Sequence, residues 1–307
     1  MPRRRNPLFR WLSTFAAIAF ARFTALLPLP ATRALGRSIG RAIHALVPRA
    51  RLDARAHLDL AFGDSISRTE KDRILRGACA NLGIVAAEFS RAGRLARPES
   101  GALYSVEGLE HVDRSRGALM IGAHLGNWEW MCGAATAIGL RVAEVVRPLD
   151  DPRLDAFVDG MRRASGASTI SKDNAGGEII RKLRDGWFVG VLIDQSPRDN
   201  AAPATFFGHP CWATIAPAMV ALRSKAPIHP VSMTRNADGT YTLRFHPALS
   251  FARSGDFRRD LQAIAQQCQD AVEAMVREYP DQWLWLHRRW KPRGRLESEW
   301  AARAGNS

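Results

Sequence analysis

The chain has 307 residues, of which 46% are hydrophobic, and it carries a formal charge of +14. This length and apolar content are enough for a sizeable hydrophobic core and exclude a disordered protein. No uncharged apolar run reaches the roughly 18 residues that a polytopic transporter repeats, and four widely spaced cysteines exclude a secreted disulfide scaffold. The charge predicts an anionic partner, which is a nucleic acid, a phospholipid surface or an acidic protein.

The first 60 residues hold most of this charge, with eleven arginines against two acids. Within them, residues 11–21 form an uncharged stretch that is short for a membrane span of roughly twenty residues, and arginines flank it on both sides. We therefore expect residues 1–30 to form a membrane-anchoring helix that lies in the plane of an anionic membrane surface. A single tilted span and a helix of a soluble core are the alternatives.

Residues 36–40 read Gly-Arg-Ser-Ile-Gly and match the G-x-S-x-G turn that carries a hydrolase nucleophile. That turn needs a strand before it and a helix after it, whereas the Arg/Ala/Leu pattern around Ser38 predicts one continuous helix. We therefore interpret the two glycines as small residues on a helix face.

The middle of the chain alternates between short apolar runs and amphipathic segments. The apolar runs predict strands at residues 118–123, 142–146, 187–193, 228–233 and 240–246. The amphipathic segments predict helices at residues 128–138, 154–165, 175–184, 214–224 and 256–278. This alternation predicts an α/β fold with a central, mostly parallel sheet flanked by helices. We expect this domain to cover residues 31–295 and to be followed by a tail at 296–307.

The residues that can carry chemistry gather at one predicted strand-to-helix turn. Asn127 can cap the helix that follows, which puts His124 on the turn and Glu129 in the first helical turn. On a tight turn that contains Gly126, the two side chains can meet. Glu129 would then hold one imidazole nitrogen while the other acts as a general base. Gly126 and Asn127 would bring backbone amides close to a developing oxyanion, which suits acyl transfer. A structural turn histidine is the alternative.

These residues also carry a resemblance to a known family. His124 to Glu129 match the H-x4-D/E signature, in its H-x-G-N-W-E form, of the lysophospholipid acyltransferase superfamily. The sequence resembles most the lauroyl and myristoyl acyltransferases of lipid A biosynthesis. Further matching blocks follow in order: Arg147-Pro148 with Asp151-Pro152, Arg162 with Gly166, Asp194-Gln195, Phe206-Phe207-Gly208, and Trp283 with His287-Arg288-Arg289 and Lys291. The resemblance covers roughly residues 30–295 and implies a glycerolipid-acyltransferase-like fold.

The resemblance also implies roles for single residues. His124 would be the general base that deprotonates an acceptor hydroxyl, and Glu129 would orient and polarise His124. No covalent acyl-enzyme would form. The other matched positions would support substrate binding or the oxyanion: Gly126, Asn127, Arg147, Arg162, Asp194, Gln195, Phe206, Phe207, His287, Arg288 and Arg289. A purely structural role stays open for seven of these residues: Arg162, Asp194, Phe206, Phe207, His287, Arg288 and Arg289. No metal site is expected, because no third ligand lies near His124 and Glu129 in the sequence.

The implied activity is that of a membrane-bound O-acyltransferase on the cytoplasmic face of the bacterial inner membrane. It would move a fatty acyl group from an acyl carrier protein or coenzyme A thioester to a hydroxyl of a lipid A precursor or a related glycolipid. The donor is a substrate, so no tightly bound cofactor is expected. The same motifs fit acylation of a phosphatidylinositol mannoside or a lysophospholipid. Asp151, where the family has Asn, leaves the exact substrate open. A non-catalytic protein that binds anionic membranes and a thioester hydrolase are the alternatives, whereas no nucleic-acid-binding module is recognisable.

Overall fold

The computed structural model describes residues 7–95, 101–173 and 175–304 of the chain. Its α-helices are α1 (Pro7–Leu26), α2 (Leu29–Leu46), α3 (Pro48–Phe62), α4 (Arg68–Glu88), α5 (Trp128–Ala137), α6 (Pro152–Ala164), α7 (Ala175–Arg184), α8 (Ala216–Ser224), α9 (Phe257–Glu278) and α10 (Gly294–Ala304). Its strands are β1 (Tyr104–Glu107), β2 (Ala118–Gly122), β3 (Val142–Val146), β4 (Ser168–Ser171), β5 (Phe188–Leu192), β6 (Ala201–Phe206), β7 (His209–Thr214), β8 (Ile228–Arg235) and β9 (Tyr241–Phe245). Short 3-10 helices are η1 (Phe89–Arg94), η3 (Leu109–His111) and η4 (Pro280–Gln282).

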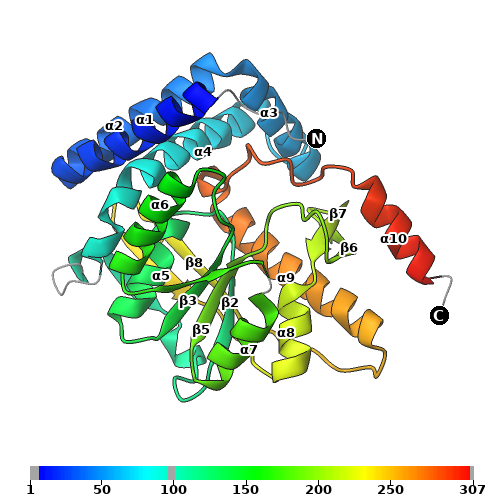
Figure 1. Cartoon of the computed structure of the whole chain (residues 1–307). Helices are drawn as coiled ribbons and strands as arrows, with labels where there is room; N and C mark the ends of the chain where they lie inside the picture. The colour runs from blue at the N-terminus through cyan, green and yellow to red at the C-terminus, as the bar shows by residue number, and fades with distance from the viewer. Residues whose placement is uncertain (1–6, 96–100, 174, 305–307) are drawn as a thin grey trace.

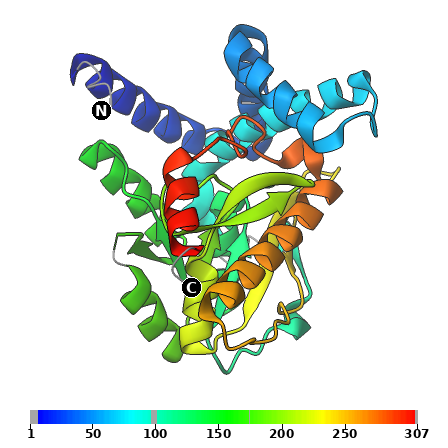
Figure 2. The ribbon, with the colours of Figure 1, turned by 90° about the vertical axis from the view of Figure 1, so that its right-hand side faces the viewer.

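Seven strands form the central sheet, in the order β1-β9-β8-β2-β5-β3-β4. Neighbouring strands are parallel except β8 and β9, which are antiparallel. Helices lie on both faces of this sheet, as Figures 1 and 2 show. The predicted α/β fold with a mostly parallel central sheet is confirmed.

The side chains of the central strand β2 alternate between two hydrophobic clusters. Leu119 and Ile121 pack in the cluster that includes α7, α8 and α9, whereas Ala118 and Met120 pack in the cluster that includes α5. Successive side chains of a strand point to opposite faces, and both faces of this sheet are covered. For this reason the strand is apolar throughout, and a continuous apolar run was enough to predict it.

A two-stranded hairpin, β6–β7, lies beside the central sheet and was not predicted. Phe206 pairs with His209, so Phe207 and Gly208 form a two-residue turn in which both residues have positive φ, 52° and 73°. This is the geometry of a type I′ turn, for which Asn-Gly is the usual sequence signal. Phenylalanine rarely adopts a positive φ, so the sequence contains no clear signal for this hairpin.

Helices α2 and α4 touch backbone to backbone above the sheet (Figure 1). A Cβ atom on Gly40 would lie 2.1 Å from the carbonyl oxygen of Cys79, and one on Gly83 would lie 2.1 Å from that of Gly36. The interpretation of residues 36–40 as small residues on a helix face is confirmed. Glycine is needed there because any side chain would push the two helices apart.

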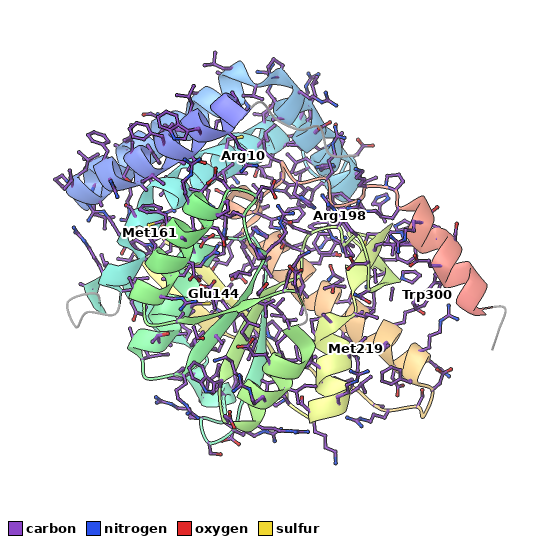
Figure 3. All side chains as sticks on the ribbon, in the orientation of Figure 1. Arg10, Glu144, Met161, Arg198, Met219 and Trp300 are labelled. Atoms are coloured by element: carbon purple, nitrogen blue, oxygen red, sulfur yellow. The ribbon has the colours of Figure 1, made fainter. Side chains whose placement is uncertain are left out.

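Helix α1 lies within the segment that was expected to anchor the protein, and residues 1–6 of that segment lie outside the described residues. Arg10 of α1 lies 3.7 Å from the Asp151 carboxylate at the start of α6 (Figure 3). Among the described residues, no helix has both the length and the apolar character that membrane crossing requires. The expected in-plane anchor is not tested by this finding and stays a prediction.

The expected tail at 296–307 is largely helical. Helix α10 begins at Gly294, and Leu296 is buried beside Ala201 and Trp212. The guanidinium of Arg258 on α9 stacks 4.2 Å from the ring centre of Trp300 (Figure 3). The helix is thus docked on the domain at least as far as Trp300, while residues 305–307 lie outside the described residues.

Replacing Gly40 with alanine should lower the melting temperature by several degrees, because the new methyl group collides with the α4 backbone and overpacking costs about 1–3 kcal/mol. Gly160→Ala is the matched control, since Gly160 is an exposed residue of α6 whose Cβ would meet nothing within 4 Å. The control should leave the melting temperature unchanged or raise it, because alanine favours helix. Equal melting temperatures for Gly40→Ala and the wild type would contradict the close contact.

Candidate active site

His124 and Asp194 meet where two neighbouring parallel strands end. Strand β2 ends at Gly122 and β5 ends at Leu192, and these two residues are register partners. Residues 124 and 194 therefore leave the sheet at the same edge, where α/β folds commonly place their sites. The Nδ1 atom of His124 lies 2.8 Å from Asp194 Oδ1, and the backbone N–H of His124 donates to Asp194 Oδ2 at 2.9 Å.

Asp194 is buried, with 2% of its surface exposed, and Trp283 Nε1 donates a third hydrogen bond to it at 2.8 Å. Burial by itself would raise the pKa of Asp194, but the facing imidazole and these hydrogen bonds lower it to about 2. Asp194 is therefore a carboxylate at any physiological pH. This carboxylate is the hydrogen-bond acceptor that fixes the proton of a neutral His124 on Nδ1.

The other imidazole nitrogen of His124 is thereby left as a base. Burial lowers the pKa of His124, but the charge and hydrogen bond of Asp194 outweigh this and raise it above its ordinary value. Nε2 keeps its lone pair in the neutral imidazole, and the Gln195 side-chain nitrogen lies 3.3 Å from it. The arrangement can remove a proton from a hydroxyl placed at Nε2.

Glu129 does not bind the imidazole of His124, although its place in the sequence predicts that contact. Asn127 caps α5 as predicted, because its side chain accepts a hydrogen bond from the Trp130 backbone at 3.2 Å. Glu129, in the first turn of α5, instead binds the guanidinium of Arg162, whose Nη2 lies 3.1 Å from both carboxylate oxygens. The expected pairing of Glu129 with the imidazole is replaced by Asp194, because the end of β5 brings that carboxylate directly to Nδ1.

Arg162 lies between two acids rather than on the surface. Besides Glu129, its Nε lies 3.7 Å from Glu144 at β3. Burial raises the pKa of Glu144 to about 7, and Arg162 opposes that rise. With two carboxylates as partners, Arg162 holds Glu129 in place, and its expected role in substrate binding or oxyanion support stays a prediction. Figure 3 marks Glu144 within the fold.

The backbone N–H groups of Gly126 and Asn127 already donate hydrogen bonds within the protein. Gly126 has a φ of +61°, and a Cβ on it would lie 2.0 Å from the Met233 carbonyl oxygen, so the position requires glycine. Its N–H donates to Gln282 at 3.1 Å, and the N–H of Asn127 donates to Met233 at 2.8 Å. These two N–H groups are therefore committed to protein carbonyl oxygens, and the expected support of an oxyanion at the start of α5 stays a prediction.

The two phenylalanines of the expected site belong to an aromatic cluster. Phe206 is fully buried and Phe207 almost so, and their rings lie 5.1 Å apart. Both also contact Trp290, and Phe206 contacts Trp283, whose indole binds Asp194. Their position is that of aromatic residues in the hydrophobic core, which was the structural alternative to a role in substrate binding. Trp283 was quoted in the sequence motif but not predicted to touch the site.

The basic residues near the C-terminus divide into exposed and buried ones. Arg289 is 1% exposed and donates to Gln269 Oε1 at 2.7 Å, which ties the C-terminal segment to α9. His287 Nε2 accepts a hydrogen bond from the Ser196 backbone at 3.1 Å, and burial lowers its pKa to about 4. Arg288 is about half exposed and pairs with Asp53 at 2.7 Å.

Arg147 of the expected site is also about half exposed, with its Nη2 3.6 Å from Asp150. It follows β3 at the same edge of the sheet as His124. Arg147 and Arg288 are therefore the two expected cations whose charge solvent or a substrate can reach, whereas Arg162 and Arg289 are committed to protein partners.

Comparison with known proteins identifies the family. A sequence model described as "Bacterial lipid A biosynthesis acyltransferase" matches residues 3–292. The chain belongs to this family. It is similar to the lipid A biosynthesis palmitoleoyltransferase of Escherichia coli (27% identical over 274 residues, 87% of each chain) and to that organism's lipid A biosynthesis lauroyltransferase (26% over 293 residues, 92% of each). It is also similar to a phosphatidylinositol mannoside acyltransferase of Mycolicibacterium smegmatis (26% over 236 residues, 71% of this chain and 73% of the relative).

The protein is therefore a lipid acyltransferase, as its family membership and the names of its relatives indicate. The predicted family is confirmed by these matches. The roles of the individual site residues are not decided by similarity, and they stay predictions from the geometry.

Replacing Asp194 with asparagine should lower kcat by a factor of about 10² to 10⁴, because Nδ1 loses the carboxylate that orients it. The pH at which activity falls on the acid side should also move down. Asp194 raises the pKa of His124 and burial lowers it, so removing the carboxylate leaves burial to dominate. The pH profile of kcat/KM measures both effects.

Glu129→Gln is the comparison variant for this experiment. Glu129 raises the pKa of His124 less than Asp194 does, because its charge acts without a hydrogen bond to the imidazole. The acid limb of the pH profile should therefore move less in Glu129→Gln than in Asp194→Asn. A larger shift for Glu129→Gln than for Asp194→Asn would contradict the assignment of Asp194 as the partner of the imidazole.

Proposed function

We propose that the protein transfers a fatty acyl group from an acyl carrier protein or coenzyme A thioester to a hydroxyl of a lipid A precursor or a related glycolipid. The observation that carries this proposal is the His124–Asp194 pair, at 2.8 Å, at the carboxyl edge of the sheet. The membership of the chain in a lipid A acyltransferase family supports the acceptor class. The reaction takes place at the cytoplasmic face of the bacterial inner membrane.

In the proposed reaction, Nε2 of His124 takes the proton of the acceptor hydroxyl while that oxygen attacks the thioester carbonyl carbon. The resulting tetrahedral intermediate expels the thiolate as its carbon–sulfur bond breaks. The imidazolium then returns the proton to the thiolate, so that an ester and a free thiol leave the enzyme. Asp194 stabilises the positive charge on the imidazolium during this cycle. No acyl group is attached to the protein.

Helix α1 provides the surface for a membrane in this proposal. Phe9, Trp11, Phe15 and Phe23 are each about half exposed or more, and Arg22 on the same helix is also exposed. Exposed arginines continue along α2 and into α3, namely Arg37, Arg41 and Arg49. Figure 2 shows α1 extending away from the sheet, where an apolar face with flanking cations can enter an anionic interface.

His124→Ala should lower acyl transfer by at least about 10²-fold, because the imidazole that takes the proton of the acceptor hydroxyl is removed. The assay follows transfer from an acyl-carrier-protein thioester, and in parallel from the coenzyme A thioester, to a lipid A precursor, with a phosphatidylinositol mannoside and a lysophospholipid as comparison acceptors. Near-normal transfer by the variant would refute the mechanism. Thioester cleavage at equal rates with and without any acceptor would instead identify a hydrolase.

Exchanging Trp11 and Phe15, whose rings stack 5.8 Å apart, for glutamate should weaken binding to vesicles that contain anionic lipid by about tenfold or more. The matched control is Phe257→Glu, which changes an exposed phenylalanine of α9 and should leave vesicle binding unchanged. Vesicle flotation measures both. Equal loss in the two variants, or none in either, would contradict the assignment of α1 as the membrane surface.

A further inference from the structure

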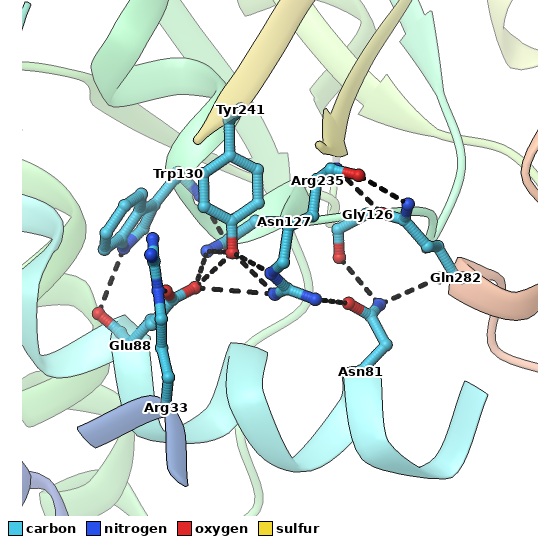
Figure 4. Close-up of polar contacts among 9 residues, drawn as sticks. All are labelled: Arg33, Asn81, Glu88, Gly126, Asn127, Trp130, Arg235, Tyr241 and Gln282. Atoms are coloured by element: carbon cyan, nitrogen blue, oxygen red, sulfur yellow. Dashed lines mark hydrogen bonds and ion pairs between the residues drawn. The ribbon is translucent and has the colours of Figure 1, made fainter. Parts of the chain in front are cut away.

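A buried carboxylate at the end of α4 forms the centre of a polar cluster that the reaction above does not use. Glu88 is 0% exposed. Its Oε1 accepts a hydrogen bond from Arg33 Nε at 2.5 Å, and its Oε2 lies 3.6 Å from Arg235 Nη2 and accepts a hydrogen bond from the Tyr241 hydroxyl. Figure 4 shows these side chains from α2, β8 and β9 converging on the one carboxylate.

The Glu88 carboxylate holds this cluster together electrostatically. A buried charge costs several kcal/mol unless it is paired and hydrogen-bonded, and Glu88 has both kinds of partner. Without its negative charge, Arg33 and Arg235 would face each other across the same small volume. A buried network of ion pairs and hydrogen bonds of this kind favours one arrangement of its members.

One branch of the cluster reaches the catalytic turn through Asn127. The side-chain nitrogen of Asn127 donates to Glu88 Oε2 at 2.8 Å, while its side-chain oxygen caps α5 by accepting from the Trp130 backbone. Trp130 in turn donates its indole N–H to the backbone oxygen of Glu88 at 3.0 Å. Both ends of the Asn127 amide are therefore committed, which fixes the start of α5 relative to α4.

A second branch reaches the neighbouring residue of the turn through Asn81. Arg235 Nη1 donates to Asn81 Oδ1 at 2.6 Å, and Asn81 Nδ2 donates to the carbonyl oxygen of Gly126 at 2.9 Å. The same nitrogen also donates to the Gln282 carbonyl at 2.9 Å. The cluster thus holds residues 126 and 127 from two sides (Figure 4).

We propose that Glu88 is a positioning residue for the acyl transfer reaction. It acts through Asn127 and, by way of Arg235 and Asn81, through Gly126. In this way it fixes the turn that carries His124 and the distance of the imidazole from Asp194. Through Arg33 the same carboxylate joins this turn to α2. The inference rests on the proposed function, because it concerns the base of that reaction.

The test combines Glu88→Gln with Asn127→Ser. Glutamine keeps the size of the side chain and removes its charge. Serine keeps the helix cap and removes the nitrogen that binds Glu88. Each variant should lower kcat about ten- to a hundredfold with little change in KM for the thioester, because the base is displaced rather than the donor site. The acid limb of the pH profile should move to lower pH, because the Asp194 contact loosens.

A double-mutant cycle separates positioning from a general loss of stability. If Glu88 acts through Asn127, the double variant should lose little more kcat than the worse single variant. Asp256→Ser is the matched control, since Asp256 caps α9 through the backbone N–H groups of Arg258 and Arg259. Within the described residues, its side chain makes no hydrogen bond to the turn. That variant should retain the kcat and the pH profile of the wild type.

Melting temperatures decide what the kinetic results mean. A lowered melting temperature in Glu88→Gln and Asn127→Ser, with kcat and the acid limb of the wild type, would show a merely structural cluster and overturn the inference. Strictly additive losses in the cycle would also overturn the link. If Glu88→Gln does not fold, Asn127→Ser alone still decides, because an unchanged kcat in that variant refutes the proposal. Failure of the wild type to acylate any lipid acceptor would instead refute the proposed function.

Discussion

The buried carboxylate of Asp194 connects three parts of the chain that are far apart in sequence. It accepts hydrogen bonds from the backbone and the imidazole of His124 after β2, and from the indole of Trp283 near the C-terminus. An unpaired carboxylate in this position would be costly, so the two strand ends and the C-terminal segment must come together for it to be satisfied. The base is therefore assembled only in the tertiary structure, where these three segments meet.

The arginines that give the chain its positive charge occupy two kinds of position, inside the fold and on its surface. Several arginines pair with buried or partly buried acids or donate to oxygens inside the fold: Arg33 and Arg235 at Glu88, Arg162 at Glu129 and Glu144, and Arg289 at Gln269 and Trp212. Arginine suits these positions because its guanidinium remains charged when buried and donates several hydrogen bonds. The exposed arginines of α1, α2 and α3 are the ones that the proposed function assigns to an anionic membrane surface. A net charge alone could not separate these two groups, because burial depends on the tertiary fold.

The local sequence pattern predicted much of the fold. It failed where a residue's partner comes from a distant part of the chain. The apolar runs located five strands of the central sheet, and Asn127 was correctly predicted to cap α5. The partner of His124 was not predictable from spacing, since it depends on β5 lying beside β2. The same holds for the amides of the turn, which are used by Met233 and Gln282 from elsewhere in the chain. Glu88 carried no sequence signal, because a single acid at the end of a helix is usually solvated.

The glycine contact between α2 and α4 has a practical meaning for work with this protein. Removing the N-terminal helices is a common way to make a membrane-associated enzyme easier to handle in solution. Here the missing α2 would leave a strip of α4 around Gly83 and Cys79 without side chains to cover it. Glu88 would lose Arg33 at the same time. A shortened chain would thus expose an apolar strip of α4 and would leave Glu88 with Arg235 as its remaining cation. Purification of the full chain is therefore the better route to an active sample.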